Sequence, residues 1–319
     1  MNSILKRLST SLTRQLPMAL AMVGALCTSG CDMGKFMADQ AFKSAGKAGQ
    51  GVQTIHDYET IKKIAMAGMG QLEGLHAMSP NNPAGLQLLM KAWAGVGSAF
   101  IWDEYELAFD NDDDAEMEYQ KLRAQAAFKR AKFFGERLMA QKVDDFDEIK
   151  QSGAKEIRAW LKLNFTDEED APLLLWYAFA SINAVGANTH DSALISELYV
   201  SEEFFQRVVE LDEGLENALA HIVLGGFYAR PFGEPERGKK HLDRALELTG
   251  GKFTAVQLAT AITYDCQTHN KENYIKNLQA VMGAPDPLPE QRVGTVVARR
   301  KAYRYLHNPA WQDECGFTL

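Results

Sequence analysis

The stretch LENALAHIVLGGFYARPFGEPERGKKHLDRALELTGGKF, from Leu215 to Phe253, sets a pattern that the rest of the chain repeats. Two segments with apolar residues at helical spacing flank the turn-forming residues 231–235. This arrangement predicts two antiparallel helices. Gly225 and Gly238 fall where the two helices approach most closely, because a larger side chain there would push the backbones apart.

The spacing of these small and apolar residues is that of a tetratricopeptide repeat, and it occurs four times along the chain. In chain order the four copies are Trp93, Val96, Gly97, Phe100, Ala124, Phe128 and Ala131; Trp176, Phe179, Ala180, Asn183, Ser201, Phe205 and Val208; His221, Leu224, Gly225, Tyr228, Gly238, Leu242 and Ala245; and Ala255, Leu258, Ala259, Ile262, Lys271, Ile275 and Leu278. The pattern predicts an all-α fold, a tetratricopeptide-like helical repeat superhelix with four cryptic repeats plus flanking helices.

Composition limits the classes of function. The chain has 319 residues, of which 46% are hydrophobic, and its net charge is −8 at pH 7. A repeat array grows by stacking, so this length fits one extended domain. The acidic balance and the lack of a basic patch argue against nucleic acid as a partner, because phosphate binding needs concentrated positive charge.

Residues 1–30 have the features of an export signal. A basic start is followed by the apolar segment 16–26, which is too short to span a bilayer as a helix. Small residues then precede Cys31, and this arrangement resembles the lipobox of bacterial lipoproteins, in which the cysteine carries the lipid. Because Thr28 stands where leucine is usual, an ordinary secretory leader is the alternative.

The expected location is the bacterial cell envelope, with the body facing the periplasm and a lipid anchor in the membrane. Asp32, directly after Cys31, resembles the signal that keeps lipoproteins at the inner membrane in some bacteria. That rule is not universal, so the inner and the outer membrane both stay open.

We divide the chain into a lipoprotein signal peptide (1–30), a lipidated flexible tether (31–56), a tetratricopeptide-like helical domain (57–308) and a C-terminal tail (309–319). The tether follows from a segment rich in small and polar residues. Its few large apolar side chains are alternative contacts to the lipid surface: Met33, Phe36, Met37 and Phe42.

Two further helices are expected outside the repeats. One covers residues 146–163, between the first and second repeats. The other covers about residues 290–306, follows a proline-rich break and is amphipathic. We expect this last helix to cap the open end of the stack.

The cysteine count agrees with export. Two cysteines remain after the leader and Cys31, namely Cys266 and Cys315. They could pair in an oxidising compartment or remain free, because the sequence does not show whether their Cα atoms lie within about 7 Å.

Apparent catalytic and metal motifs lack their structural context. Residues 233–239 match the spacing of a phosphate-binding loop, but no strand precedes them and Pro235 removes an amide. The acidic run 110–114 resembles the start of a calcium loop, but Ala115 stands where glycine must turn the chain. We interpret it as a solvated loop, with weak calcium binding as the alternative.

Nothing in the sequence indicates an enzyme, a metal centre or a cofactor. The histidines include no HExxH pair, and His221 occupies a repeat position that normally packs in the core. No serine or cysteine nucleophile has a recognisable partner.

Several segments together resemble the T component of tripartite ATP-independent periplasmic (TRAP) transporters, the TatT lipoproteins. They are the lipobox leader and the segments 93–104, 173–182, 221–231, 245–253 and 298–302. The resemblance implies a non-enzymatic, membrane-tethered homotrimer with a central pore. It further implies binding of the transporter's periplasmic substrate-binding subunit, and an apolar cleft that could pass a small organic acid or hydrophobic ligand.

Stacked helix pairs present one inner wall on which a partner or ligand could bind. The candidates for that wall are Trp102, Asp103, Trp176, Tyr177, Asn183, Tyr228, Arg230, Lys252 and Tyr264. Arg230 and Lys252 are the cations that could hold a carboxylate ligand. The alternative function is a general tetratricopeptide-repeat scaffold lipoprotein of the cell envelope. Neither the ligand nor the direction of its transfer follows from the sequence.

Overall fold

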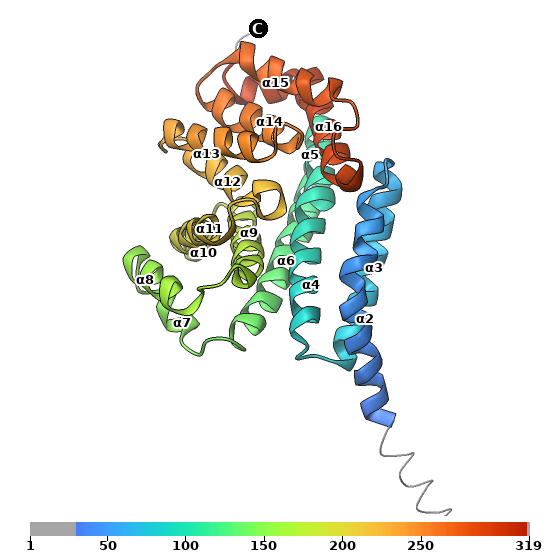
Figure 1. The fold of residues 1–319 in the computed structure, drawn as a ribbon. Helices are drawn as coiled ribbons and strands as arrows, with labels where there is room; N and C mark the ends of the chain where they lie inside the picture. Colours follow the sequence, from blue (N-terminus) through green and yellow to red (C-terminus); the bar gives the residue numbers. More distant parts are fainter. Residues whose placement is uncertain (1–29, 318–319) are drawn as a thin grey trace, which may run out of the picture.

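The computed structural model describes residues 30–317, so the expected signal peptide lies almost wholly outside the described residues. The described chain is built from helices and contains no strand, which confirms the all-α class. Figure 1 shows the helices running alongside one another from the N-terminal α2 to the C-terminal α16.

In chain order the elements are α2 (Gly30–Gln53), α3 (Tyr58–Met78), α4 (Pro83–Val96), η1 (Gly97–Ile101), α5 (Trp102–Asp110), α6 (Asp114–Met139), α7 (Phe146–Ile149), α8 (Ala154–Asn164), η2 (Glu168–Asp170), α9 (Ala171–Ala187), α10 (Ser192–Ser196), α11 (Leu198–Asp212), α12 (Leu215–Tyr228), α13 (Pro235–Leu248), α14 (Ala255–Thr260), η3 (Ala261–Asp265), α15 (Lys271–Gly283), η4 (Pro289–Gln291), α16 (Arg292–His307) and α17 (Pro309–Glu314). Polar N-cap residues fix the start of several helices. The Asn82 side chain accepts a hydrogen bond from a backbone amide in the first turn of α4, and the Asp113 side chain does the same for α6.

The four expected helix pairs all pack together: α4 with α6, α9 with α11, α12 with α13, and α14 with α15. Small residues at the predicted positions make the close approaches. A Cβ on Gly97 would lie 2.8 Å from the Phe128 ring, and a Cβ on Gly238 would lie 2.6 Å from the carbonyl oxygen of Gly225. The stacking of these pairs into one superhelix stays a prediction.

The segment expected to be a flexible tether is instead helix α2, which packs against α3 and α4. Ala38 and Phe42 are fully buried, and the Phe42 ring fills the space that a side chain at Gly85 would occupy. The expectation failed because the alanines and glycines of this segment are compatible with a helix once two side chains are buried.

The extra helix expected over residues 146–163 is two helices, α7 and α8. Gly153 separates them with a φ of +117°, which lies outside the helical region. Their aromatic side chains enter the main core, where Phe146 stacks on Trp160 and meets Tyr177 edge-on.

The C-terminal region folds back onto the start of the body. Helix α16 packs on α14 and α15 but also on α3, and its side chains bond to α5. The helix expected to cap only one open end therefore also contacts α3 and α5, in the first part of the body. The expected tail contains α17, and the Cys315 that follows it is disulfide-bonded to Cys266. The pairing that the sequence left open is thus present.

Residues 83–110 form one continuous helical stretch that is long and apolar enough to cross a membrane. Half of its most apolar segment is buried inside the protein. It packs along α6, and two of its carboxylates, on Asp103 and Glu106, are buried in ion pairs. In this structure the stretch is a central helix that packs inside the body of the protein.

Candidate functional site

The loop between α12 and α13 exposes a large aromatic side chain. Phe232 is fully exposed, at 108% of its reference area, and its φ is +60°. A bulky residue rarely adopts this left-handed conformation, so the surrounding turn must hold it there. The amide of Gly233 donates to the Arg230 carbonyl at 2.9 Å, and that of Glu234 donates to the Tyr228 carbonyl at 2.7 Å.

Gly233 cannot be replaced without opening this turn. A Cβ on it would lie 2.3 Å from the Tyr228 carbonyl oxygen, well inside van der Waals contact. In this turn Phe232 lies in solvent. Exposed aromatic side chains held in place are typical anchors of protein interfaces.

Arg230 adds a positive charge to the same loop, two residues before Phe232. It is exposed, and its guanidinium lies 3.8 Å from the centre of the Phe227 ring. Stacking on the ring fixes the guanidinium plane while leaving its N–H groups available to a carboxylate. Arg237 differs, since Glu202 and Glu234 both lie within ion-pair distance of it.

Beneath the loop lies a buried polar cluster. Tyr228 donates its hydroxyl hydrogen to Glu202 and accepts a hydrogen bond from Gln206 at 3.0 Å. Its ring stacks on His241, whose Nδ1 lies 2.9 Å from Nδ1 of His221. Burial lowers the pKa of both histidines, that of His241 to about 4. Tyr228, a candidate for ligand binding, is thus a packing residue in this structure.

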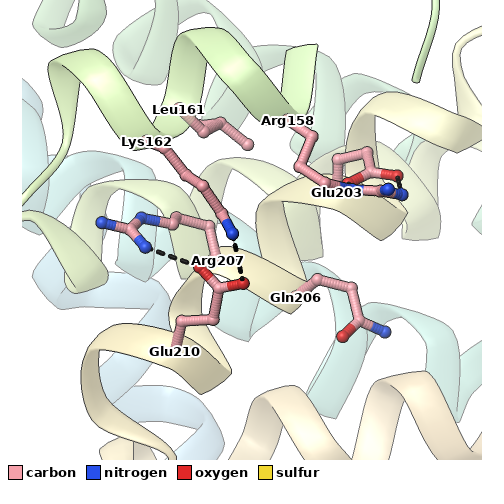
Figure 2. Close-up of a pocket in the computed structure, with 7 residues that line it drawn as sticks. All are labelled: Arg158, Leu161, Lys162, Glu203, Gln206, Arg207 and Glu210. Atoms are coloured by element: carbon pink, nitrogen blue, oxygen red, sulfur yellow. Dashed lines mark hydrogen bonds and ion pairs between the residues drawn. The ribbon is translucent and has the colours of Figure 1, made fainter. Parts of the chain in front are cut away.

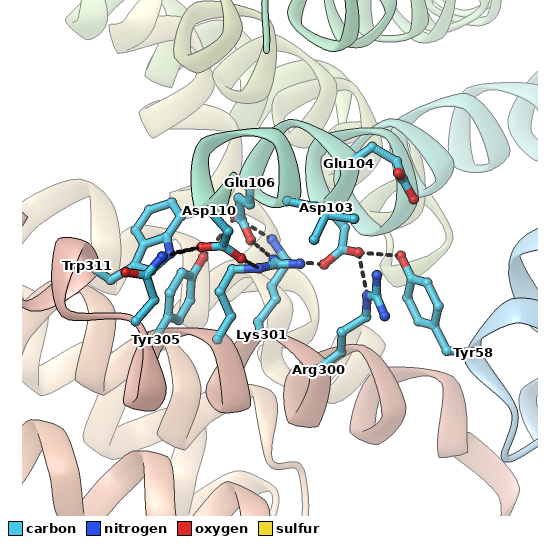
Figure 3. Close-up of polar contacts among 12 residues, drawn as sticks. Tyr58, Asp103, Glu104, Glu106, Asp110, Arg300, Lys301, Tyr305 and Trp311 are labelled. Carbon is cyan, nitrogen blue, oxygen red and sulfur yellow. Dashed lines mark hydrogen bonds and ion pairs between the residues drawn. The ribbon is translucent and has the colours of Figure 1, made fainter. Parts of the chain in front are cut away.

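A second polar cluster joins α5 to α16 (Figure 3). Asp103 is fully buried and accepts hydrogen bonds from Tyr58 at 2.8 Å, Arg300 at 2.6 Å and Arg304 at 3.0 Å. Burial alone would raise the pKa of Asp103, but these donors and the Arg304 charge outweigh it and lower the pKa. This candidate for partner binding has no surface to offer a partner.

The other acids of α5 are engaged in the same way. Glu106 accepts from Lys301 at 2.7 Å, from Arg304 at 2.7 Å and from Tyr305 at 2.8 Å. Asp110, expected in a solvated or calcium-binding loop, instead pairs with Arg304 Nε at 2.6 Å and accepts from the Trp311 indole. The cluster is a satisfied charge network that ties α16 to α5 and to Tyr58 of α3.

The remaining sequence candidates lie in separate places. Trp102 is half-buried and stacks on Tyr105, and the amide of Asn183 donates to the Phe179 carbonyl of its own helix. Tyr264 donates to Glu236 at 3.0 Å. Lys252 is exposed after α13, at the opposite end of that hairpin from Arg230, so the structure does not bring the two cations together.

Trp176 and Tyr177 lie on α9 and are buried in the hydrophobic core of the protein. Lys91 approaches the Trp176 ring at 5.1 Å and forms an ion pair with Glu216. Glu216 begins three consecutive left-handed residues, 216–218, an arrangement that sequence reasoning did not find. Phe232 was also missed, although a large apolar residue between proline and glycine in a turn is a visible signal.

Two hollows lie away from this loop. One holds about 20 Å³, room for a single water, and its charged groups pair across it, as Lys162 and Arg207 do with Glu210 (Figure 2). The other is an open groove of about 450 Å³ between the ends of α4, α6 and α9. Its cation, Lys142, is paired with Asp170, and Glu169 adds further negative charge.

Among residues 30–317, no cluster of three or more histidine, cysteine or acidic side chains has the geometry of a metal site. Cys31, the proposed lipid carrier, lies in the first turn of α2.

Comparison with known proteins assigns the chain to a family. The family model for the TRAP transporter T-component matches residues 55–310, which include every helix from α3 to α16. None of the curated proteins matches the chain. Because the family model matches most of the chain, this protein belongs to the TRAP transporter T-component family.

Proposed function

We propose that this protein is a lipid-anchored, non-enzymatic component of a TRAP transporter that binds the transporter's periplasmic substrate-binding subunit. The family match supports the association with the transporter. The lipobox-like sequence before Cys31 supports the anchor. The disulfide between Cys266 and Cys315 supports an oxidising compartment such as the periplasm, because such bonds are rare in the cytosol.

The proposed surface for the substrate-binding subunit rests on one structural observation. Phe232 is fully exposed, and its turn holds the backbone there at a φ of +60°. Covering an exposed aromatic side chain with a partner lowers the free energy of the complex, and a backbone already held in its conformation loses little entropy on binding. Because Arg230 lies in the same loop, the loop suits a protein surface that has an apolar pocket next to a carboxylate.

The ligand-passing role that the family suggests has a defined candidate site. The groove between α4, α6 and α9 is large enough for a small organic molecule, and Pro83, Ala84, Leu138 and Leu173 line it with apolar surface. Since Lys142 is already paired with Asp170, the groove suits the apolar part of a ligand better than a free carboxylate.

Binding of the two purified proteins, measured by calorimetry, tests the surface. Asparagine tolerates positive φ, so Phe232→Asn removes the side chain and keeps the turn. We expect it to weaken binding by roughly tenfold or more, the size typical of an interface anchor, without lowering the melting temperature. Leu163→Asn, at another strongly exposed apolar residue, is the matched control and should bind normally.

Normal binding by the Phe232→Asn variant would show that the interface lies elsewhere on the protein. Absence of binding by the unaltered protein would reject the partner, and capture of other envelope proteins instead would favour the general scaffold. Light scattering on the same sample tests the homotrimer that the family suggests, and a strict monomer would count against it.

A further inference from the structure

Helix α2 carries its first two turns beyond the body of the protein. Figure 1 shows the N-terminal end of α2 projecting past the neighbouring helices. Three large apolar side chains lie on this end: Met33, Phe36 and Met37, which are 57%, 59% and 62% exposed. Large apolar groups gathered in solvent usually mark an interaction surface.

These three side chains share one face of the helix, because residues three and four apart are neighbours on a helix surface. The opposite face holds Ala38 and Phe42, which are buried against the body. The apolar character stops abruptly along the exposed face. Further along, this face carries exposed Gln40, Ser44 and Lys47.

Helix α2 is fastened where it meets the body. The Asp39 carboxylate accepts hydrogen bonds from Ser79 at 2.6 Å and from Asn82 at 2.7 Å, both in the turn between α3 and α4. The Phe42 ring fills the space above Gly85, where a Cβ would lie 2.6 Å from it. The projecting turns are therefore rigidly connected to the helices behind them.

We propose that Met33, Phe36 and Met37 insert into the surface of the lipid bilayer, so that α2 orients the body on the membrane. The inference rests on the proposed lipid anchor at Cys31. Met37, the furthest of the three, is six residues from Cys31, which is about 9 Å along a helix. A partner helix would need apolar residues further along the face, whereas a bilayer covers only the turns next to the anchor.

The fixed attachment of α2 determines which end of the body faces the lipid. Asp39 holds the turn before α4, and Pro83 and Ala84 at the start of α4 line the open groove. The groove therefore lies at the membrane-proximal end. Insertion of an apolar helix face reaches about 5–10 Å into the boundary between headgroups and acyl chains.

The test places a fluorescent label on the full chain, expressed in a bacterium that processes lipoproteins and reconstituted in vesicles of phosphatidylethanolamine and phosphatidylglycerol. Phe36→Cys and, as a matched control on the same exposed face, Ser44→Cys each supply a thiol for an environment-sensitive fluorophore. Cys266 and Cys315 are disulfide-bonded, and an acylated Cys31 is blocked by its lipid, so the label goes to the new thiol. Where Cys31 is not acylated, the labelling is repeated with Cys31→Ser so that position 36 alone carries the label. Lipids carrying a quencher near the top of the acyl chain report insertion, and mass spectrometry of the N-terminal peptide reports acylation of Cys31.

We expect strong quenching and a blue shift at position 36, and little of either at position 44. Adding Met33→Asp and Met37→Asp should abolish the quenching at position 36, whereas Leu163→Asp should not change it. An acylated protein with no quenching at position 36 overturns the inference but leaves the anchor intact. A protein without acylation that still shows quenching at position 36 supports the inference and rejects the anchor. A protein that shows neither acylation of Cys31 nor quenching at position 36 rejects both the anchor and the inference.

Discussion

The α12–α13 hairpin and the α5–α16 junction join helices in opposite ways. In the hairpin, two helices next to each other in the chain meet through Gly225 and Gly238, with backbone atoms nearly in contact. In the junction, Asp103 and Arg304 are 201 residues apart and meet through buried charges. The close approach in the hairpin is possible because the two glycines have no side chain. The junction is held by buried acidic and basic side chains that neutralise one another's charge.

This difference affects how each region responds to change. Filling a glycine contact strains the packing of the two helices but leaves no charge unpaired. A buried charge network fails sharply, because removing one member leaves its partners charged and away from water. The junction therefore provides the larger effects and the hairpin the smaller ones.

The largest expected effect comes from Arg304→Met, which removes the guanidinium shared by Asp103, Glu106 and Asp110. Removing one partner of a buried ion pair typically costs about 3–5 kcal/mol, and here three carboxylates lose a shared partner, although Asp103 keeps Arg300 and Glu106 keeps Lys301. We expect a loss of that size in the free energy of unfolding, measured by urea denaturation. Lys240→Met, at an exposed lysine of α13, is the control and should change stability by less than about 0.5 kcal/mol. A small loss for Arg304→Met would show that the junction is not closed in solution.

A smaller effect is expected at the hairpin. Gly238→Ala would place a Cβ 2.6 Å from the Gly225 carbonyl oxygen and 2.9 Å from the Ala229 nitrogen, both backbone atoms that cannot rotate away. We expect a loss of about 1–3 kcal/mol from overpacking, although alanine is the better helix former. The control is Gly95→Ala, since nothing lies within 4 Å of a Cβ there. It should stabilise α4 by up to about 1 kcal/mol, and equal effects of the two changes would contradict the close packing.

The same contrast explains what the sequence could predict. The helix pairs follow from residues near one another in the chain, so the positions of Gly97, Gly225 and Gly238 could be inferred from spacing alone. The family could also be recognised from short motifs. The all-α class needed only the helical periodicity and the absence of strand patterns.

The junction could not be inferred, because its two halves look like ordinary charged helix faces. Asp103, Glu106 and Asp110 repeat at helical spacing, as do Arg300 and Arg304, and such stripes are usually solvated. Nothing in either stripe specifies a partner about two hundred residues away. For the same reason Asp103 was a candidate for partner binding, and α16 was expected to cap only one end.

The burial of the binding candidates could not be predicted for a related reason. Repeat spacing identifies which residues lie on a first helix but not how deeply each one is buried, so Trp176, Tyr177 and Tyr228 were grouped with exposed Arg230. The backbone conformation that exposes Phe232 depends on a turn whose hydrogen bonds involve Tyr228 and Arg230. Local composition indicates a turn there but not its direction.

The smallest expected effect is a difference in how the stability of the hairpin and of the junction depends on pH. Burial lowers the pKa of His221 and of His241, the latter to about 4, whereas a histidine in the unfolded chain titrates near 6.5. The neutral pair therefore stabilises the hairpin fully above about pH 6.5, and this stability is lost as the pH falls toward about 4. The pKa of Asp103 is also lowered, so the contribution of the junction is lost only below about pH 4, where the unfolded carboxyl becomes protonated.

Between pH 7 and pH 5 we expect the free energy of unfolding to fall by about 1–2 kcal/mol through the hairpin. The variant with both His221→Gln and His241→Gln should lose less over this range, because glutamine does not titrate. His190→Gln, at an exposed histidine between α9 and α10, is the control and should keep the original slope. An unchanged slope in the double variant would mean that the two rings are not buried together as the 2.9 Å separation of their Nδ1 atoms requires.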